Sequence, residues 1–279
     1  MTSVALITGG AGGMGVATAK IVGRDHPVVL CDVRQDRLDS AVATLADLGI
    51  SATAVNCDVT ERQAVDRLFG TAAELGPVTA VIHAAGVSPS MGDAAYVMRT
   101  NALGTLNVNE AFYENVGEGS AIVNVASMAS YMLPDGIVPA EHFPLALDDP
   151  DAFVKTLLAT CDMAPEEARS GFAYALSKTF VRWYSSSQAE RFNGRGLRIV
   201  SVSPGSVDTE MGRLEEQAGA GAMVADAAVP RWGKPEEMAE LFAFCVSAKA
   251  GYLTGTDILN DGGVVASMRE RARAAAAKG

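Results

Sequence analysis

The sequence predicts a doubly wound α/β fold, a parallel sheet of about seven strands with helices on both faces. Two observations predict it. Short apolar runs alternate along the chain with longer stretches of helical period. The runs are also continuous, without the polar alternation of a half-exposed sheet, which is typical of parallel strands covered on both faces. Strands that alternate with helices indicate right-handed crossovers.

The elements follow from these patterns in chain order. The predicted strands are Val4–Thr8, which ends in glycines, Pro27–Asp32, Ser51–Cys57, Val78–His83, Ala121–Ala126, Leu197–Val202 and a last one near Asp257–Leu259. The predicted helices between them are Met14–Val22, Gln35–Leu48, Glu61–Leu75, a long one from about Ala94 to Asn115, one near Phe172–Arg191, and Pro235–Ser247.

No Gly-, Ser- or Pro-rich linker and no internal repeat divides residues 1–279, so we expect a single domain. Two segments interrupt the rhythm. Residues 128–171 form a proline-containing insertion, and a connection that long in a compact domain is usually functional. Residues 208–229 are rich in small residues and predict a lid over the substrate site. The tail 268–279 predicts a basic, alanine-rich helix that either frays or docks on a neighbouring subunit.

Composition limits the function classes. The formal net charge of −11 disfavours nucleic acid and anionic membrane surfaces as partners. The four cysteines form no CxxC motif, and His26, His83 and His142 are not clustered with them, so we expect no metal. The uncharged first 19 residues lack a basic n-region and are interrupted by five glycines, unlike a signal peptide. We therefore expect a cytoplasmic protein with reduced thiols.

The first strand runs directly into a glycine-rich turn, Thr8–Gly15 (TGGAGGMG), and then into a helix. Glycines permit positive φ and close approach of the backbone to a ligand. The helix start beyond them presents free N–H groups and a positive dipole end to a pyrophosphate. In a strand–turn–helix unit this pattern indicates a Rossmann-like dinucleotide site. The alternative is a tight turn without a ligand.

Acidic residues follow the next two predicted strands. Asp32 can accept hydrogen bonds from both ribose hydroxyls of an adenosine and would repel a 2′-phosphate, which favours NAD. Arg34 lies nearby and leaves NADP open, and Asp32 alternatively caps the next helix. Asp58 occupies the matching place after the third strand, within reach of an adenine edge, or else caps the helix at Glu61.

Tyr174 and Lys178 lie four residues apart in a predicted helix and share one face. A nearby ammonium favours the phenolate, which would let a tyrosine act as a base near neutral pH. Ser127 follows the fifth strand at the edge where α/β sheets bind ligands, and Asn101 lies in a helix interior, where Asn is unfavourable without a task. The alternatives are an exposed helix pair, a turn-capping Ser and a surface Asn.

These residues resemble the motifs of the short-chain dehydrogenase/reductase family, in its compact single-domain branch, over most of the chain. The resemblance implies a catalytic tetrad of Asn101, Ser127, Tyr174 and Lys178. It implies a nicotinamide dinucleotide site made of Thr8, Gly9, Gly13, Met14, Gly15, Asp32, Val33, Asp58, Val59, Ala84, Ala85, Gly86, Tyr174, Lys178, Pro204, Gly205, Val207 and Thr209.

The implied activity is hydride exchange between NAD and a secondary alcohol or ketone, in a homodimer or homotetramer. Tyr174 would exchange the proton, Lys178 would lower the tyrosine pKa and hold the ribose, and Asn101 would position a water. Two features depart from the family. His83 replaces the usual Asn, and Ser127 lies 47 residues before Tyr174, an insertion comparable to that of some hydroxysteroid dehydrogenase-like members. The alternatives are a non-catalytic NAD-binding scaffold and an NAD-dependent epimerase or dehydratase.

Apolar side chains near Ser127 suggest a lipophilic substrate, steroid- or terpenoid-like. We expect them to line a pocket, or alternatively to pack in the core: Met128, Tyr131, Met132, Leu133 and Phe143. Met211, Leu214 and Met223 are expected in the lid over that pocket.

Overall fold

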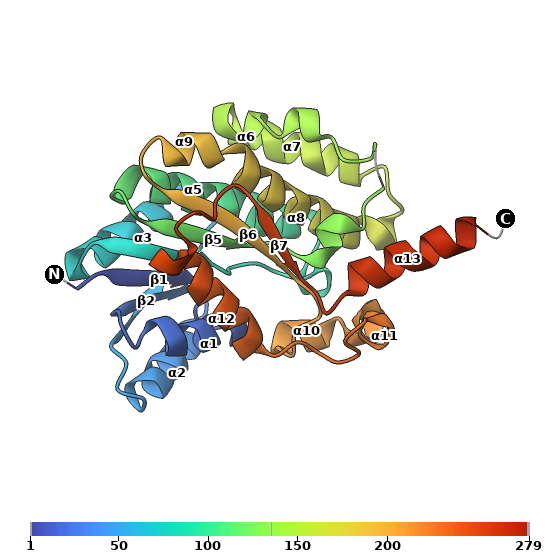
Figure 1. Cartoon of the computed structure of the whole chain (residues 1–279). Coiled ribbons are helices and arrows are strands. Elements are labelled where there is room, and N and C mark those ends of the chain that lie inside the picture. The colour runs from blue at the N-terminus through green and yellow to red at the C-terminus, as the bar shows by residue number, and fades with distance from the viewer. Residues whose placement is uncertain (1, 135, 278–279) are drawn as a thin grey trace.

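The computed structural model describes residues 2–134 and 136–277 and contains a seven-stranded parallel sheet of order β3-β2-β1-β4-β5-β6-β7 (Figure 1). The strands are β1 (Val4–Thr8), β2 (Val28–Asp32), β3 (Ala52–Asn56), β4 (Val78–His83), β5 (Ala121–Val125), β6 (Arg198–Pro204) and β7 (Asp257–Asn260). The predicted fold class is confirmed. From β1 to β3 successive strands are added towards one edge of the sheet, and from β4 to β7 they are added towards the other edge. Sheets of this kind bind ligands at the point between β1 and β4 where the strand order reverses.

Two layers of helices cover the sheet, each with its own apolar core. One face carries α1 (Gly13–Val22), α2 (Gln35–Ala46) and α12 (Pro235–Val246), and the other carries α3 (Arg62–Leu75), α5 (Gly104–Asn115) and α8 (Arg169–Ser187) (Figure 1). The inner strands β1, β2, β4, β5 and β6 are mostly buried between these layers, which explains their continuous apolar runs, while the edge strands β3 and β7 are mainly half-buried.

The long helix predicted from about Ala94 to Asn115 is interrupted. It consists of α4 (Ala94–Met98), a π-helical turn η2 (Arg99–Leu103) and α5. π turns widen a helix by one residue and occur often at functional sites. Asn101 lies in this turn.

The insertion forms short helices and a third layer outside α8 (Figure 1). These are η3 (Met128–Tyr131), η4 (Ala140–His142), α6 (Leu145–Asp148), α7 (Pro150–Cys161) and η5 (Glu166–Ala168). Asp149 caps the start of α7, and its side chain accepts the Ala152 N–H at 3.0 Å. Its buried side chains pack on α4 and α8: Phe153, Val154, Leu157 and Cys161. The insertion thus extends the core of that face.

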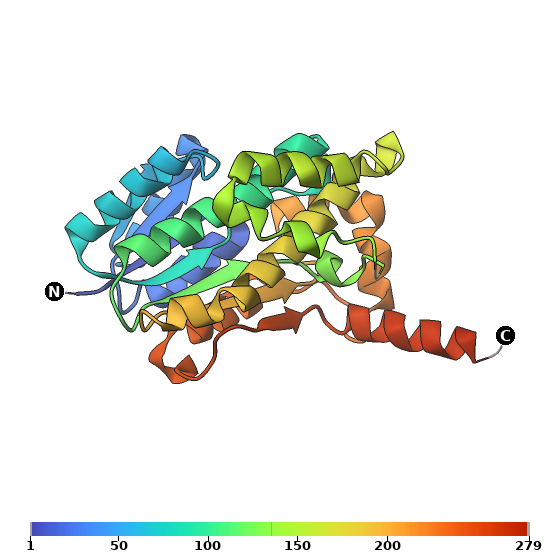
Figure 2. The ribbon, with the colours of Figure 1, turned by 90° about the horizontal axis from the view of Figure 1, so that it is seen from above.

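The segment after β6 folds into α10 (Glu210–Leu214), a turn η6 (Glu216–Ala220) and α11 (Gly221–Asp226). The C-terminal helix α13 (Val264–Ala276) begins before the predicted 268 and projects away from the sheet (Figures 1 and 2). Arg271 pairs with Asp226 at 2.9 Å and ties the base of α13 to α11. Residues 278–279 of the predicted tail helix lie outside the described residues. Within the described part of the chain, no helix combines the length and the apolarity needed to span a bilayer.

Candidate active site

The glycine-rich turn between β1 and α1 has the geometry of a phosphate cradle. Gly9 has φ of +64°, and a Cβ there would lie 2.7 Å from the Ala84 backbone, so only glycine fits. A Cβ on Gly15 would lie 2.3 Å from the Gly9 carbonyl oxygen. Among the described residues, no side chain caps the start of α1 at Gly12, which leaves its first N–H groups for a ligand. The turn therefore fits a dinucleotide pyrophosphate.

Thr8, predicted to contact the cofactor, is fully buried, and its hydroxyl faces His83 Nδ1 at 2.7 Å. The Thr105 hydroxyl gives its single proton to the Asn101 carbonyl at 2.7 Å, so His83 Nε2 must donate to Thr105, at 3.0 Å. This leaves Nδ1 as the acceptor for the Thr8 hydroxyl. Thr8 in turn accepts the Ala85 N–H at 3.3 Å. The chain of hydrogen bonds joins the cofactor turn to the π turn.

The adenosine end of the candidate site carries Asp32, whose Oδ1 accepts the Arg34 N–H at 3.2 Å. The Arg34 guanidinium forms two hydrogen bonds with Asp36, at 3.0 and 2.8 Å, and is thereby engaged by another carboxylate. Asp58 Oδ1 accepts the Thr60 N–H at 2.9 Å. Val33 is exposed and Val59 is buried against the start of α5, so only Val33 offers its side chain to a ligand.

The four residues of the predicted tetrad converge at the ends of β4 and β5. Lys178 Nζ is buried and donates to the Val125 carbonyl at 2.8 Å. A Cβ on Gly86 would lie 3.3 Å from Lys178 Nζ and 3.0 Å from Asn101 Oδ1, so this glycine permits their close approach. Tyr174 lies one turn before Lys178 on α8, with its ring centroid 5.9 Å from Nζ.

Asn101 and Ser127 differ in how many of their side-chain hydrogen-bonding groups are already occupied. Asn101 accepts the Val87 N–H at 2.9 Å and donates to the Val87 carbonyl at 3.0 Å, so its amide holds the segment after β4. The surface-residue alternative is wrong, because Asn101 is buried. The Ser127 hydroxyl accepts the Ala129 N–H at 3.2 Å and keeps its own proton for another acceptor.

Burial and neighbouring groups set the protonation of this cluster. Burial lowers the pKa of Lys178 to about 8. Burial raises the pKa of Tyr174, the Ser127 hydroxyl lowers it in part, and the Glu215 carboxylate raises it further. The pKa of Tyr174 is thus raised overall in this structure, whereas the sequence predicted that Lys178 lowers it; the contribution that does lower it comes from Ser127.

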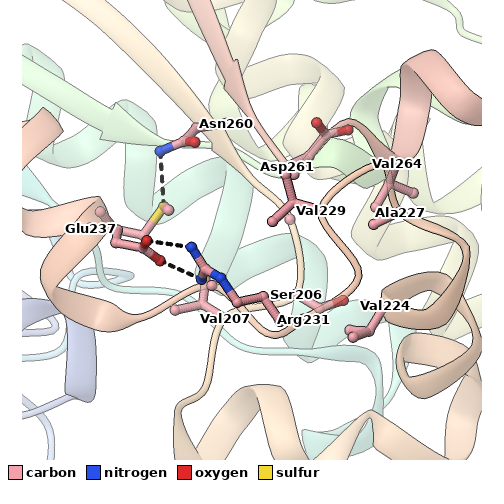
Figure 3. A pocket seen from close by; sticks show the side chains of 14 residues that line it. Ser206, Val207, Val224, Ala227, Val229, Arg231, Glu237, Asn260, Asp261 and Val264 are labelled. Atoms are coloured by element: carbon pink, nitrogen blue, oxygen red, sulfur yellow. Dashed lines mark hydrogen bonds and ion pairs between the residues drawn. The ribbon is translucent and has the colours of Figure 1, made fainter.

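The turn after β6 separates two cavities. Gly205 packs so tightly against the residue after β7 that a Cβ would lie 2.7 Å from Asp261 Cα. Val207 pairs with Gly233 in an isolated bridge. Figure 3 shows one of these cavities, which has a volume of about 300 Å³. In its lining the Arg231 guanidinium donates two hydrogen bonds to the Glu237 carboxylate, at 2.8 and 2.6 Å. Thr209 caps α10 by accepting the Gly212 N–H at 3.0 Å.

The other cavity, of about 310 Å³, extends from Met14 of the glycine-rich turn to three residues of the tetrad, Ser127, Tyr174 and Lys178. Residues predicted from sequence that line it are Met14, Ala84, Gly86, Ser127, Met128, Met132, Tyr174, Lys178, Pro204, Gly205, Val207, Thr209, Met211 and Met223. The lining also includes residues that the sequence did not single out, among them Val87, Ser88, Pro89, Glu215 and Trp232. Ser88 and Pro89 follow the recognised Ala84–Gly86 motif directly, which is the signal that could have found them.

Four side chains predicted for the substrate pocket or its lid lie elsewhere. Phe143 is fully buried in the core, where it packs edge-on against Phe180. Leu133 also packs against the core, and Leu214 is exposed. The Tyr131 hydroxyl is drawn away by a hydrogen bond to Asp257 at 2.6 Å. Among the described residues, no group of His, Cys, Asp and Glu side chains is arranged to hold a metal ion.

Comparison with known proteins decides the family. A family model described as "short chain dehydrogenase" matches residues 3–138, and another, described as "Enoyl-(Acyl carrier protein) reductase", matches residues 157–265. The short-chain dehydrogenase/reductase bsc3 of Alternaria brassicicola is 31% identical over 276 residues, which cover 96% of this chain and 98% of that protein. The chain belongs to the short-chain dehydrogenase/reductase family. As a member, it is an oxidoreductase of a family that binds nicotinamide cofactors.

Other members and solved structures agree with this. Dehydrogenase/reductase SDR family member 4 of Bos taurus is 28% identical, over 95% of this chain and 88% of that protein. A short-chain dehydrogenase from Burkholderia cenocepacia J2315, in complex with NADP, is 25% identical with a TM-score of 0.73, over 95% of this chain and 98% of that one. A dehydrogenase/reductase from Sinorhizobium meliloti 1021 has a TM-score of 0.75 at 22% identity, with 94% of both chains covered, and has the same fold.

Proposed function

We propose that this short-chain dehydrogenase/reductase interconverts a secondary alcohol and a ketone with NAD as cofactor. One observation carries the proposal: Ser127, Tyr174 and Lys178 line one cavity together with Met14 of the glycine-rich turn. A hydroxyl donor, a phenol and a buried ammonium beside a dinucleotide site suit proton exchange at a substrate oxygen. When bound, the nicotinamide accepts or returns the hydride.

The residues divide the work as follows. The Ser127 hydroxyl donates a hydrogen bond to the substrate oxygen and orients it. The Tyr174 hydroxyl takes the alcohol proton during oxidation and returns it during reduction. Lys178, anchored on the Val125 carbonyl, presents its remaining N–H donors to the ribose hydroxyls. Asn101 holds Val87 through two hydrogen bonds and thereby fixes the wall beside Gly86.

The preference for NAD rests on the adenosine end. Asp32 is the last residue of β2 and carries a carboxylate that would repel a 2′-phosphate, and Arg34 is engaged by Asp36. The NADP held by the Burkholderia relative makes the opposite preference a real alternative. Steady-state kcat/KM measured with NAD and with NADP tests the preference for NAD. The Asp32→Asn variant should lower the ratio of kcat/KM with NAD to kcat/KM with NADP. A wild-type preference for NADP would overturn this part of the proposal.

The Tyr174→Phe variant tests the reaction itself. We expect loss of alcohol and ketone turnover with nearly unchanged NAD binding, because the ring remains and only the exchanging hydroxyl is removed. Tyr96→Phe is the matched control, since Tyr96 is 47% exposed and lies outside the cavity lining. Retained turnover in Tyr174→Phe would sink the assignment. Wild-type NAD binding without turnover of any alcohol or ketone would favour a non-catalytic scaffold.

The apolar lining supports a lipophilic substrate, of steroid or terpenoid size. Four methionines form much of the substrate end: Met128, Met132, Met211 and Met223. Flexible thioethers adapt to bulky apolar ligands. Faster turnover of soluble sugars or polyols than of apolar alcohols would contradict this.

We also propose a homodimer. Helix α7 packs on α4 and α8, so the insertion covers this helical face and leaves fewer faces of the fold open to contact between copies. Light scattering of the purified protein tests this, and a tetramer would contradict it.

A further inference from the structure

Glu215 stands where the lid meets the opposite wall of the cavity. It follows the last residue of α10, and its Oε1 accepts the Ser90 N–H at 3.0 Å. Ser90 belongs to the short helix η1 (Pro89–Met91) after β4. The contact joins two segments far apart in sequence across the substrate end, and it keeps the Glu215 carboxylate in the lining of the cavity.

The charge of Glu215 has no counterpart at that end. Among the described residues that line the cavity, the charged side chains are Lys178 and Glu215. Lys178 lies at the cofactor end, anchored on the Val125 carbonyl. Within the described part of the chain, Glu215 Oε2 has no hydrogen-bond partner, and the residue is half-buried. One carboxylate oxygen is therefore open to a ligand, in a cavity lined mainly by apolar residues.

Glu215 also lies close enough to act on the reacting groups. Its negative charge raises the pKa of Tyr174 across the cavity. Tyr174 and Glu215 line the same cavity, so a substrate whose oxygen lies at Tyr174 can reach the Glu215 carboxylate with a remote substituent of suitable length.

We propose that Glu215 is a specificity-determining residue that selects lipophilic alcohols carrying a second hydrogen-bond donor, a hydroxyl or an ammonium, remote from the reacting carbon, and rejects carboxylates. The proposal rests on the proposed function and names its substrate class. A hydrogen bond to a charged, partly desolvated acceptor is stronger than a neutral one. A substrate carboxylate would meet like charge in the same surroundings, and such repulsion discriminates between ligands.

A matched set of alcohols measures this selectivity. The set is cyclohexanol substituted at carbon 4 by methyl, hydroxymethyl, aminomethyl or carboxylate, with spacers lengthened by one and two methylenes to cover the distance to Glu215. We expect kcat/KM with NAD to fall in the order ammonium, hydroxyl, methyl, carboxylate. The first and last should differ roughly tenfold or more.

The variants Glu215→Gln and Glu216→Gln separate charge from fold. The amide oxygen of Glu215→Gln can still accept the Ser90 N–H, so the lid contact persists while the charge is lost. We expect the preference for the ammonium substrate to be lost in Glu215→Gln and to persist in Glu216→Gln. Glu216 is the matched control because its carboxylate pairs with Arg213 at 3.3 Å. The acidic limb of the oxidation profile should also move to lower pH in Glu215→Gln, because a charge that raises the pKa of Tyr174 is gone.

Calorimetry on the NAD-loaded Tyr174→Phe protein gives the same ranking without turnover. Ordered binding with no wild-type turnover would overturn the alcohol–ketone proposal and leave the role of Glu215 standing. Turnover with equal selectivity in wild type and Glu215→Gln would overturn the role of Glu215 alone. No binding of any member, or tighter binding of the carboxylate, would also refute it.

Discussion

His83 makes the stability of the fold depend on pH in a way that one substitution can isolate. Its ring is 1% exposed and neutral, held between the Thr8 and Thr105 hydroxyls. Burial, with a smaller effect from the Lys178 charge, lowers its pKa from 6.5 to about 3. In the unfolded chain His83 becomes protonated below about pH 6.5, whereas in the folded protein it stays neutral down to about pH 3. Acidification between these values therefore favours unfolding.

The size of the effect follows from that shift. Each pH unit between the two pKa values costs about 1.4 kcal/mol of stability once the unfolded imidazole is mostly protonated. Between pH 7 and pH 5, His83 alone should remove about 2 kcal/mol from the free energy of unfolding. His83→Asn removes the titrating group and keeps one donor and one acceptor. The variant should be destabilised at pH 7 and should lose about 2 kcal/mol less than wild type on acidification.

Urea unfolding at pH 7 and pH 5, followed by the fluorescence of Trp183 and Trp232, measures this double difference. Carboxylates contribute equally to wild type and variant and cancel. His142→Asn is the matched control, because its side chain is 47% exposed and should leave the pH dependence unchanged. An identical loss of stability in His83→Asn and wild type between the two pH values would refute the reasoning.

Two further substitutions test the cradle and the insertion. Gly15→Ala should abolish NAD binding measured by fluorescence titration, because its Cβ would lie 2.3 Å from the Gly9 carbonyl oxygen. Gly70→Ala is the control, because its Cβ would meet nothing within 4 Å, and it should bind NAD normally. Equal NAD binding by both variants would contradict the role of the glycine-rich turn. Leu157→Ala in α7 should lower the free energy of unfolding by about 2–5 kcal/mol, since Leu157 is fully buried, and Leu147→Ala, at a 41% exposed position, should cost far less. Similar small losses at both positions would mean that the insertion is not part of the core.

The sheet could be predicted from the sequence because its strands appear as short continuous apolar runs, the composition typical of parallel strands covered by helices on both faces. Strand β4 ends at His83 as predicted, and β1, β2 and β5 differ from prediction by at most one residue. Tyr174 and Lys178 were also predictable as neighbours, because helical spacing alone puts residues four apart on one face.

The remainder depends on contacts that local sequence does not encode. The π turn at Asn101 arises where that side chain bonds to Val87 and where α5 starts close against Val59. The resemblance implied Thr8 in the cofactor site, but its side-chain hydrogen bond to His83 on another strand could not be read from the sequence. Glu215 was missed because its role depends on Ser90, 125 residues away.

The insertion has a consequence for how the site tolerates change. Ser127 is held by the end of β5, and Tyr174 by α8, so neither depends on the path of the chain between them. Loop-closure entropy grows only logarithmically, and doubling a loop costs about 0.6 kcal/mol. The excursion between the two hydroxyls can therefore vary in length at small thermodynamic cost, provided that α7 keeps its apolar face on α8. Two ends fixed by rigid elements leave the middle free to acquire a different surface.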